Sequence, residues 1–141
     1  MENHRDEMVV IFAGYTNKME VFLKRNPGLR SRVSFHVKFD DYDTESLCEI
    51  AKLIAKQKSL VLTDDAVDKL RDIFDTVRTE EDFGNGRLVR TIIEQAKMTQ
   101  ATRLLSLDLD TITKKDIETI VAEDIKTPIS TLTTKRIQVG F

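Results

Sequence analysis

Three arginines stand at positions where a guanidinium could bind an anion. Arg87 follows two glycines, Gly84 and Gly86, at the expected start of a helix. A helix start presents backbone N–H groups and the positive end of the helix dipole, and a guanidinium fork matches phosphate oxygens. Arg30 and Arg32 flank a serine in the loop expected before a strand, from where an arginine can reach a neighbour's phosphate. Taken alone, each motif fits an ordinary solvated charge better.

Other catalytic or metal-binding patterns are scarce. His4 and His36 lie far apart and outside any Cys/His cluster, and we predict no metal site. Cys48 falls beside an apolar helical stripe, which favours a buried structural thiol over a nucleophile. The aspartates of segment 40–43 could bind a cation, but a solvated hinge explains them better. No G-x-x-x-x-G-K-[ST] motif occurs, so this sequence lacks the standard backbone cradle for a triphosphate.

The composition is that of a helix-rich globular protein. With 141 residues, 40% hydrophobic and 33% charged, the chain has room for one domain, or for a small domain plus part of another. A net charge of −2 gives no basic surface for nucleic acid. No apolar run reaches the roughly 20 residues of a membrane span, and the charged N-terminus lacks a signal-peptide core. We therefore expect a cytoplasmic protein without nucleic-acid or membrane partners.

Residues 1–42 predict a strand–helix–strand unit. Residues 8–13 are an apolar run rich in β-branched side chains, which suits a buried parallel strand. Asn17 is expected to cap a helix that Pro27 ends, and the alternating segment 33–39 is expected to be a second strand. Both strands have few sheet neighbours in this sequence, so we expect them to be disordered or paired between chains.

From residue 43 onward the apolar residues recur at helical spacing and predict four amphipathic helices. Phe83 is the expected anchor of a charged loop, and Pro128 the expected stop before a polar tail. The helices are expected at 44–58, 63–77, 87–105 and 114–125, opened by caps at Asp43 or Thr44, Thr63 and Thr113. Such a series forms a small bundle with its own core, so the fold class is mainly α.

The order of these motifs resembles the later part of an AAA+ ATPase. NPGLRSR at 26–32, followed by helices and then GNGRLVR at 84–90, is a fairly specific pairing. More narrowly, residues 1–125 resemble the subfamily of stage V sporulation protein K and the red-type, CbbX-like Rubisco activase. The resemblance implies a β-α-β remnant of the α/β nucleotide-binding domain at 1–42, a four-helix AAA+ lid domain at 43–126 and a C-terminal tail at 127–141.

The resemblance also implies catalytic roles in the first 42 residues. Arg32 would be the arginine finger that reaches the ATP of an adjacent subunit, with Arg30 as its close rival. Thr16 would be the polar sensor near the attacking water or the γ-phosphate, and Tyr15 is a weaker alternative.

Further residues are implied to bind the cofactor, ATP. Arg87 would be the lid arginine that contacts the nucleotide of its own subunit, beside Gly86 and Asn85, and Ile50 would contact the adenine. The phosphate-binding loop and the acidic Mg²⁺-binding strand precede this region in such proteins. We therefore expect a C-terminal fragment with an internal first methionine, inactive alone, whose parent forms a homo-oligomeric ring, a hexamer, that acts on a protein substrate.

Two other functions fit parts of the sequence. The missing phosphate loop suits a freestanding helical adaptor or protein-interaction module without nucleotide binding. A clamp-loader-like ATPase subunit would also carry a serine–arginine finger, but the acidic composition and the lack of a basic stripe count against it.

Overall fold

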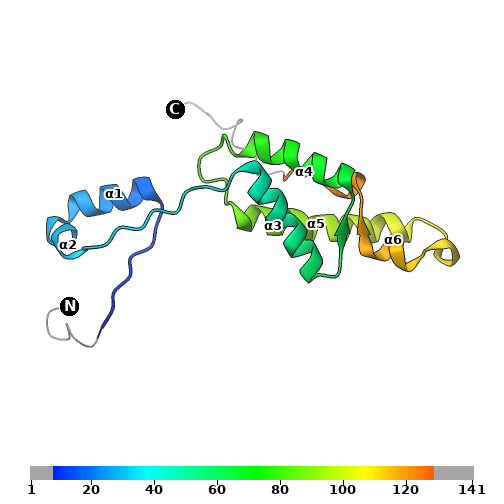
Figure 1. Ribbon diagram of the computed structural model, residues 1–141, viewed down its shortest axis with the longest axis horizontal. Coiled ribbons are helices and arrows are strands. Elements are labelled where there is room, and N and C mark those ends of the chain that lie inside the picture. The colour runs from blue at the N-terminus through cyan, green and yellow to red at the C-terminus, as the bar shows by residue number, and fades with distance from the viewer. Residues whose placement is uncertain (1–7, 129–141) are drawn as a thin grey trace, which may run out of the picture. The chain divides into compact units, whose positions relative to one another are not determined.

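The computed structural model describes residues 8–128 and divides the chain into two compact units, 1–40 and 41–141. The described residues are mainly helical, which confirms the expected fold class (Figure 1). The helices are α1 (Thr16–Arg25), α2 (Pro27–Arg32), α3 (Thr44–Gln57), α4 (Asp64–Val77), α5 (Gly86–Leu105) and α6 (Lys114–Glu118), with short 3₁₀ helices η2 (Leu109–Thr111) and η3 (Ala122–Asp124). The strands β1 (Val61–Leu62) and β2 (Thr119–Ile120) pair in parallel.

In the first unit, neither expected strand forms within the chain. Segments 8–13 and 33–39 lie outside regular secondary structure, and Val9 and Phe35 are 87% and 89% exposed. A strand is stable only where neighbours take up its backbone N–H and C=O groups, and the described residues of this unit supply no such neighbour. The predicted strand–helix–strand unit is therefore wrong for a single chain, because both segments lack the sheet neighbours that a strand needs.

The helices of the first unit also differ from expectation, because segment 29–32 is helical instead of a loop. Asn26 ends α1, and its Nδ2 donates to the Phe22 carbonyl at 2.8 Å. Pro27 then opens α2 at a position where its missing N–H costs nothing. At the other end, α1 begins at Thr16 after Tyr15, which makes no side-chain cap, so the expected Asn17 cap is wrong.

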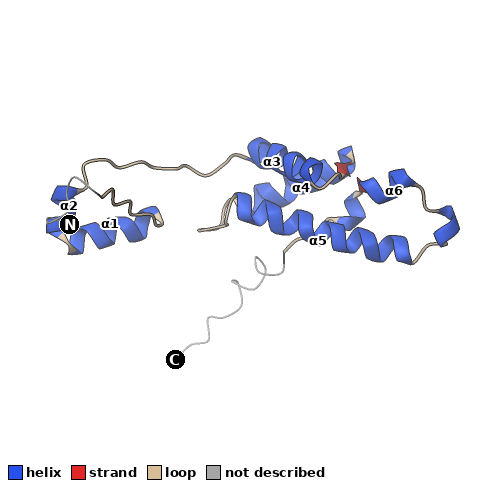
Figure 2. Cartoon of the chain, turned by 90° about the horizontal axis from the view of Figure 1, so that it is seen from below, coloured by secondary structure: helices blue, strands red, loops and turns tan. Residues whose placement is uncertain are grey.

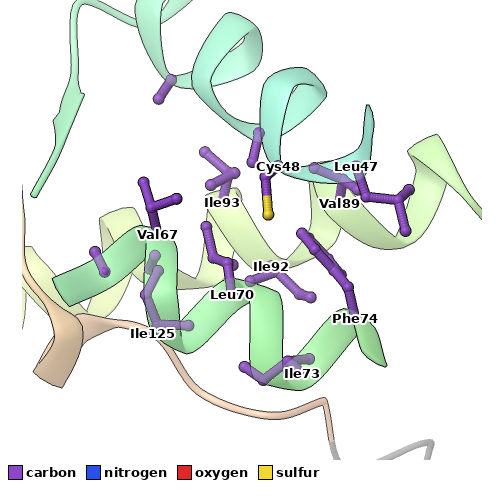
Figure 3. Close-up of a cluster of buried hydrophobic side chains, with 14 of the residues drawn as sticks. Leu47, Cys48, Val67, Leu70, Ile73, Phe74, Val89, Ile92, Ile93 and Ile125 are labelled. Carbon is purple, nitrogen blue, oxygen red and sulfur yellow. The ribbon is translucent and has the colours of Figure 1, made fainter. Parts of the chain in front are cut away.

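The core of the second unit lies among α3, α4 and α5, as the close-up in Figure 3 shows. Each helix contributes the apolar stripe that its sequence spacing predicted. Cys48 is only 1% exposed, its sulfur points into this cluster, and burial raises the pKa of its thiol. The expected structural cysteine is confirmed. Besides Cys48, the larger fully buried apolar side chains are Leu47, Leu70, Phe74, Val77, Val89, Ile92, Ile93, Ile120 and Ile125.

The helix starts of this unit follow the predicted capping residues. The Asp43 carboxylate accepts a hydrogen bond from the Ser46 backbone N–H at 2.7 Å and opens α3. This bond is the main reason that the pKa of Asp43 lies below its ordinary value. Thr63 accepts from the Ala66 N–H at 3.3 Å and opens α4. Phe83 is buried, as expected of a loop anchor.

The fourth expected helix, 114–125, is wrong beyond its first turn. The Thr113–Asp116 capping box is present, but α6 ends at Glu118 and the chain enters β2 (Figure 2, red). Residues 119–121 are β-branched, and pairing with β1 satisfies their backbone while Ile120 is fully buried. Buried Gln100 stabilises the end of α6, since its Nε2 lies 2.7–3.1 Å from the carbonyl oxygens of residues 116, 117 and 119.

An ion pair between a buried carboxylate and a partly exposed arginine attaches the last described segment to α5. Both carboxylate oxygens of Asp124, which is 0% exposed, accept from the Arg103 guanidinium at 2.9 Å. Asp124 also accepts from the Val121 N–H at 3.0 Å. The expected polar tail from Ser130 lies outside the described residues. Within residues 8–128, no helix is both long and apolar enough to cross a lipid bilayer.

Candidate functional site

The start of α5 is set by a tight turn over residues 84–87. The Arg87 N–H donates to the Gly84 carbonyl at 3.0 Å, which closes the turn. Gly84 has φ +91°, a left-handed conformation that glycine adopts without a steric penalty. Asn85 follows with φ 47° and ψ −123°, which is unusual for a residue with a side chain. The turn therefore presents Gly86 and Arg87 at the head of the helix.

The Asn85 side chain does not cap α5 but binds the residues that lead into α3. Its Oδ1 accepts from the Tyr42 backbone N–H at 2.9 Å, and its Nδ2 donates to the Asp41 carboxylate at 2.7 Å. These two bonds join segments 43 and 44 residues apart in the sequence. They explain why residues 41 and 42 belong to the second unit.

Helix α5 has a buried face and a cationic edge. Val89, Ile92 and Ile93 are fully buried, whereas Arg87 and Arg90, one turn apart, are exposed. Neither guanidinium makes a hydrogen bond or an ion pair within residues 8–128. Both are therefore available to an anionic ligand.

An open groove of about 600 Å³ lies between α3 and the start of α5. Its α3 side is mostly apolar, with Leu53 57% exposed. The half-exposed Tyr42, which precedes α3, also lines the groove. An ion pair at 3.7 Å joins Lys58, the residue that follows α3, to Glu94 of α5. The groove is lined by Tyr42, Ile50, Leu53, Ile54, Gln57, Gly86, Arg87 and Arg90.

The lining suits a ligand that is flat and apolar at one part and anionic at another. Aliphatic and aromatic side chains take up the flat part, and guanidinium groups bind phosphate or carboxylate oxygens. A volume of about 600 Å³ falls in the range of small-molecule sites, which is roughly 300–1,000 Å³. The arrangement can bind and orient such a ligand. It includes no nucleophile paired with a base.

The groove brings together three of the four residues expected to bind the cofactor. Ile50, Gly86 and Arg87 line it, and Asn85 lies beside it with its side-chain amide bonded to Asp41 and Tyr42. Sequence reasoning missed Tyr42, Leu53, Ile54, Gln57 and Arg90. Helical spacing contained part of the signal, since Arg90 follows Arg87 by three residues and Leu53 follows Ile50 by three.

The residues expected to be catalytic lie in the first unit. Thr16 is exposed in the first turn of α1. Arg30 and Arg32 are exposed in the last turn of α2, so their expected position in a loop is wrong. Cations in the last helical turn interact favourably with the negative end of the helix dipole. Their catalytic roles stay predictions.

The acidic segment 40–43 does not gather into a metal site. Asp40 pairs with Lys38 at 3.0 Å, Asp41 accepts from Asn85, and Asp43 caps α3. Among the residues that the structure describes, no three His, Cys, Asp or Glu side chains lie close enough together to hold a metal ion.

A protein-family model described as the AAA lid domain matches residues 43–135. The chain belongs to the AAA lid domain family. The motif order of the sequence had predicted this lid domain, and all residues that line the α3–α5 groove except Tyr42 fall within the matched range.

Comparison with known proteins shows which AAA+ proteins this chain is similar to. The chain is 42% identical over 116 residues to a Protein CfxQ homolog of Pyropia yezoensis and 41% identical over 106 residues to Protein CbbX of Cereibacter sphaeroides. It is 40% identical over 116 residues to the chloroplastic ribulose bisphosphate carboxylase/oxygenase activase of Cyanidioschyzon merolae. These matches cover 82%, 75% and 82% of this chain, but only 39%, 34% and 40% of the relatives. The resemblance to CbbX-like AAA+ proteins is confirmed, and its sporulation part stays a prediction.

Proposed function

We propose that residues 41–128 form the nucleotide-sensing lid of a CbbX-like AAA+ ATPase, and that the α3–α5 groove receives the adenine nucleotide. The groove itself is the main support, because it places two unpaired guanidinium groups beside an exposed apolar strip. An adenine nucleotide combines a flat base with a polyanionic chain, which is the pair of properties that this lining suits.

Each side of the groove has a part in this proposal. Arg87 contacts a phosphate of the nucleotide bound in its own subunit, and Arg90 adds a second charge one turn further along α5. Ile50, with Leu53, packs on the adenine. The space beside Gly86 is open to the ligand, since no atom lies within 4 Å of the position that a Cβ atom would take there. When the lid closes on the nucleotide, α3 and α5 would both contact it.

The rest of the proposal concerns a longer protein, since this chain spans only 34–40% of the length of these three relatives. There, ATP with Mg²⁺ would be bound and hydrolysed in a homo-oligomeric ring. Arg32, or its rival Arg30, would reach the neighbouring subunit's ATP, and Thr16 would act as the polar sensor. The target would be a protein. The name of one relative specifies ribulose bisphosphate carboxylase/oxygenase, and for this chain we propose only that the substrate is a protein. A cytoplasmic location stays a prediction.

A titration of the isotope-labelled full chain with ADP and ATP, followed by NMR, tests the lid proposal. We expect shifts of the backbone signals of Ile50, Leu53, Gly86 and Arg87, with weak affinity because the phosphate loop is not in this sequence. Arg87→Ala should weaken binding by about tenfold, as expected for the loss of a charged hydrogen bond. Nucleotide hydrolysis by this chain should be undetectable.

Lys97→Ala is the matched control, because Lys97 is an exposed cation on α5 that does not line the groove. It removes the same charge and should leave binding unchanged. Equal losses in Arg87→Ala and Lys97→Ala would mean non-specific attraction of anions, and would contradict the proposal. If neither nucleotide shifts any signal of the groove, the adaptor function becomes the better explanation.

A further inference from the structure

Asn85 makes contacts that a residue needed only to start a helix would not make. The N-cap position of α5 favours a side chain that accepts from the next turn, but Asn85 makes no such bond. Its carbonyl oxygen and its amide nitrogen are both used on the linker, which we define as Asp41 and Tyr42. The side chain is therefore directed at another part of the chain.

The backbone of Asn85 adds a second, independent observation. A φ of 47° with ψ of −123° belongs to the first corner of a turn in which glycine is strongly favoured. Residues with side chains persist in such conformations where surrounding contacts hold them, and these positions cluster at functional sites. Glycine would fit this turn with less strain, so the asparagine amide is the feature that needs an explanation.

The position of Tyr42 supplies that explanation. Tyr42 lines the α3–α5 groove together with Arg87, and its backbone N–H is bonded to Asn85, two residues before Arg87. The linker end of the groove is thus attached to the head of α5. A displacement of the linker would carry the head of α5 with it, and Tyr42 would stay in the groove that Arg87 also lines.

We infer that Asn85 is a positioning residue that holds Tyr42 at the end of the groove and so couples the linker to Arg87. Its role for the ligand is indirect, because both polar groups of its side chain are already bonded within the protein. The ligand part of this inference rests on the proposed nucleotide site, whereas the placement of Tyr42 does not.

Three variants of the full chain separate this role from general stability. Asn85→Gly keeps the turn and removes the amide. Asn85→Asp keeps an acceptor for the Tyr42 N–H but sets two carboxylates against each other. Asp41→Asn combined with Asn85→Asp exchanges the donor and the acceptor, and should restore both contacts.

The first readout is backbone hydrogen exchange by NMR, which needs no ligand. In Asn85→Gly the Tyr42 amide should exchange at least about fivefold faster, as expected for the loss of one hydrogen bond. In Asn85→Asp it should also exchange faster, because repulsion between the carboxylates at positions 41 and 85 displaces the acceptor. The core amides of Ile92 and Ile93 should keep their protection, which a global loss of stability would not allow. The double variant should return Tyr42 to the wild-type rate. An unchanged Tyr42 rate in Asn85→Gly would overturn the inference.

The second readout is ADP titration of the same variants beside Arg87→Ala. Weaker binding in the two single variants, with recovery in the double variant, would support the coupling. If Arg87→Ala weakens binding and Asn85→Gly does not, the coupling is overturned while the nucleotide site stands. If ADP does not bind the wild-type chain, the proposed function fails, and the exchange of Tyr42 alone decides whether Asn85 positions it.

Discussion

Three consecutive residues at the head of α5 meet different physical demands. Gly84 needs the freedom of glycine because its φ is +91°. Asn85 accepts a strained backbone and uses its amide on the linker. Gly86 has an ordinary φ, and a Cβ atom there would meet no atom within 4 Å. Two glycines that look equivalent in the sequence therefore differ in what they contribute.

Alanine substitutions should separate the two glycines. Gly84→Ala forces a Cβ into a left-handed conformation and should lower the free energy of unfolding by about 1–2 kcal/mol. Gly86→Ala should leave it unchanged within about 0.5 kcal/mol, because the site is open. Urea unfolding of the full chain, followed by circular dichroism, measures both. Equal destabilisation by the two variants would contradict this account of the turn.

At the level of helices and strands, α3 and α6 show that local sequence determines where a helix begins but not where it ends. Both helices begin at the residues that their capping patterns predict, because a cap is a hydrogen bond from a backbone N–H to the side chain three residues earlier. Their ends differ in origin. α3 continues to Gln57, since its apolar stripe faces α4 and α5, whereas α6 ends where β1 and Gln100 take up the next backbone groups.

The cap of α3 makes a specific prediction about pH. Its hydrogen bond to the Ser46 N–H holds the pKa of Asp43 below the ordinary 3.8, so the charged form is the one stabilised by folding. This contribution is present above that ordinary value and is lost as the pH falls through the lower folded value. The substitution Asp43→Asn would keep a side-chain acceptor at the cap without a group that titrates.

Melting temperatures of the wild type and Asp43→Asn, measured from pH 7 to pH 2, check this expectation. The advantage of the wild type should be constant down to about pH 5 and shrink below about pH 4. A difference that stays the same across the whole range would show that the charge of Asp43 does not contribute.

Across the chain as a whole, the two units differ in what they bury. The hydrophobic core cluster lies entirely between Leu47 and Ile125, within the second unit. In the described part of the first unit, Leu23 is the one buried apolar side chain, while Val9, Ile11, Phe35 and Phe39 are more than four-fifths exposed. Exposed β-branched and aromatic segments are templates for pairing with another chain.

We therefore expect the full chain to associate and residues 41–141 to stay monomeric. Size-exclusion chromatography with light scattering over a range of concentrations compares the two. Replacing Val9 and Phe35 by lysine in the full chain should reduce association, because charges oppose strand pairing. A full chain that is monomeric at every concentration would contradict the expectation.

Local patterns in the sequence were enough to predict the mainly helical class, the caps at Asp43, Thr63 and Thr113, the buried Cys48 and the cationic head of α5. Each of these depends on residues within about one helical turn of each other, where side-chain type and spacing decide the geometry. The order of its motifs also pointed to the family. These features needed no knowledge of which distant segments meet.

The pairing of β1 with β2, the shortened α6, the groove partners Tyr42 and Arg90, and the Asn85 contacts emerged only in the folded chain. Asn85 binds residues 43 and 44 positions earlier, and β1 lies far from β2 in the chain. Such contacts form because burying Ile120 and satisfying backbone groups outweigh local helical preference. The periodic pattern of a segment does not indicate which distant segment it contacts.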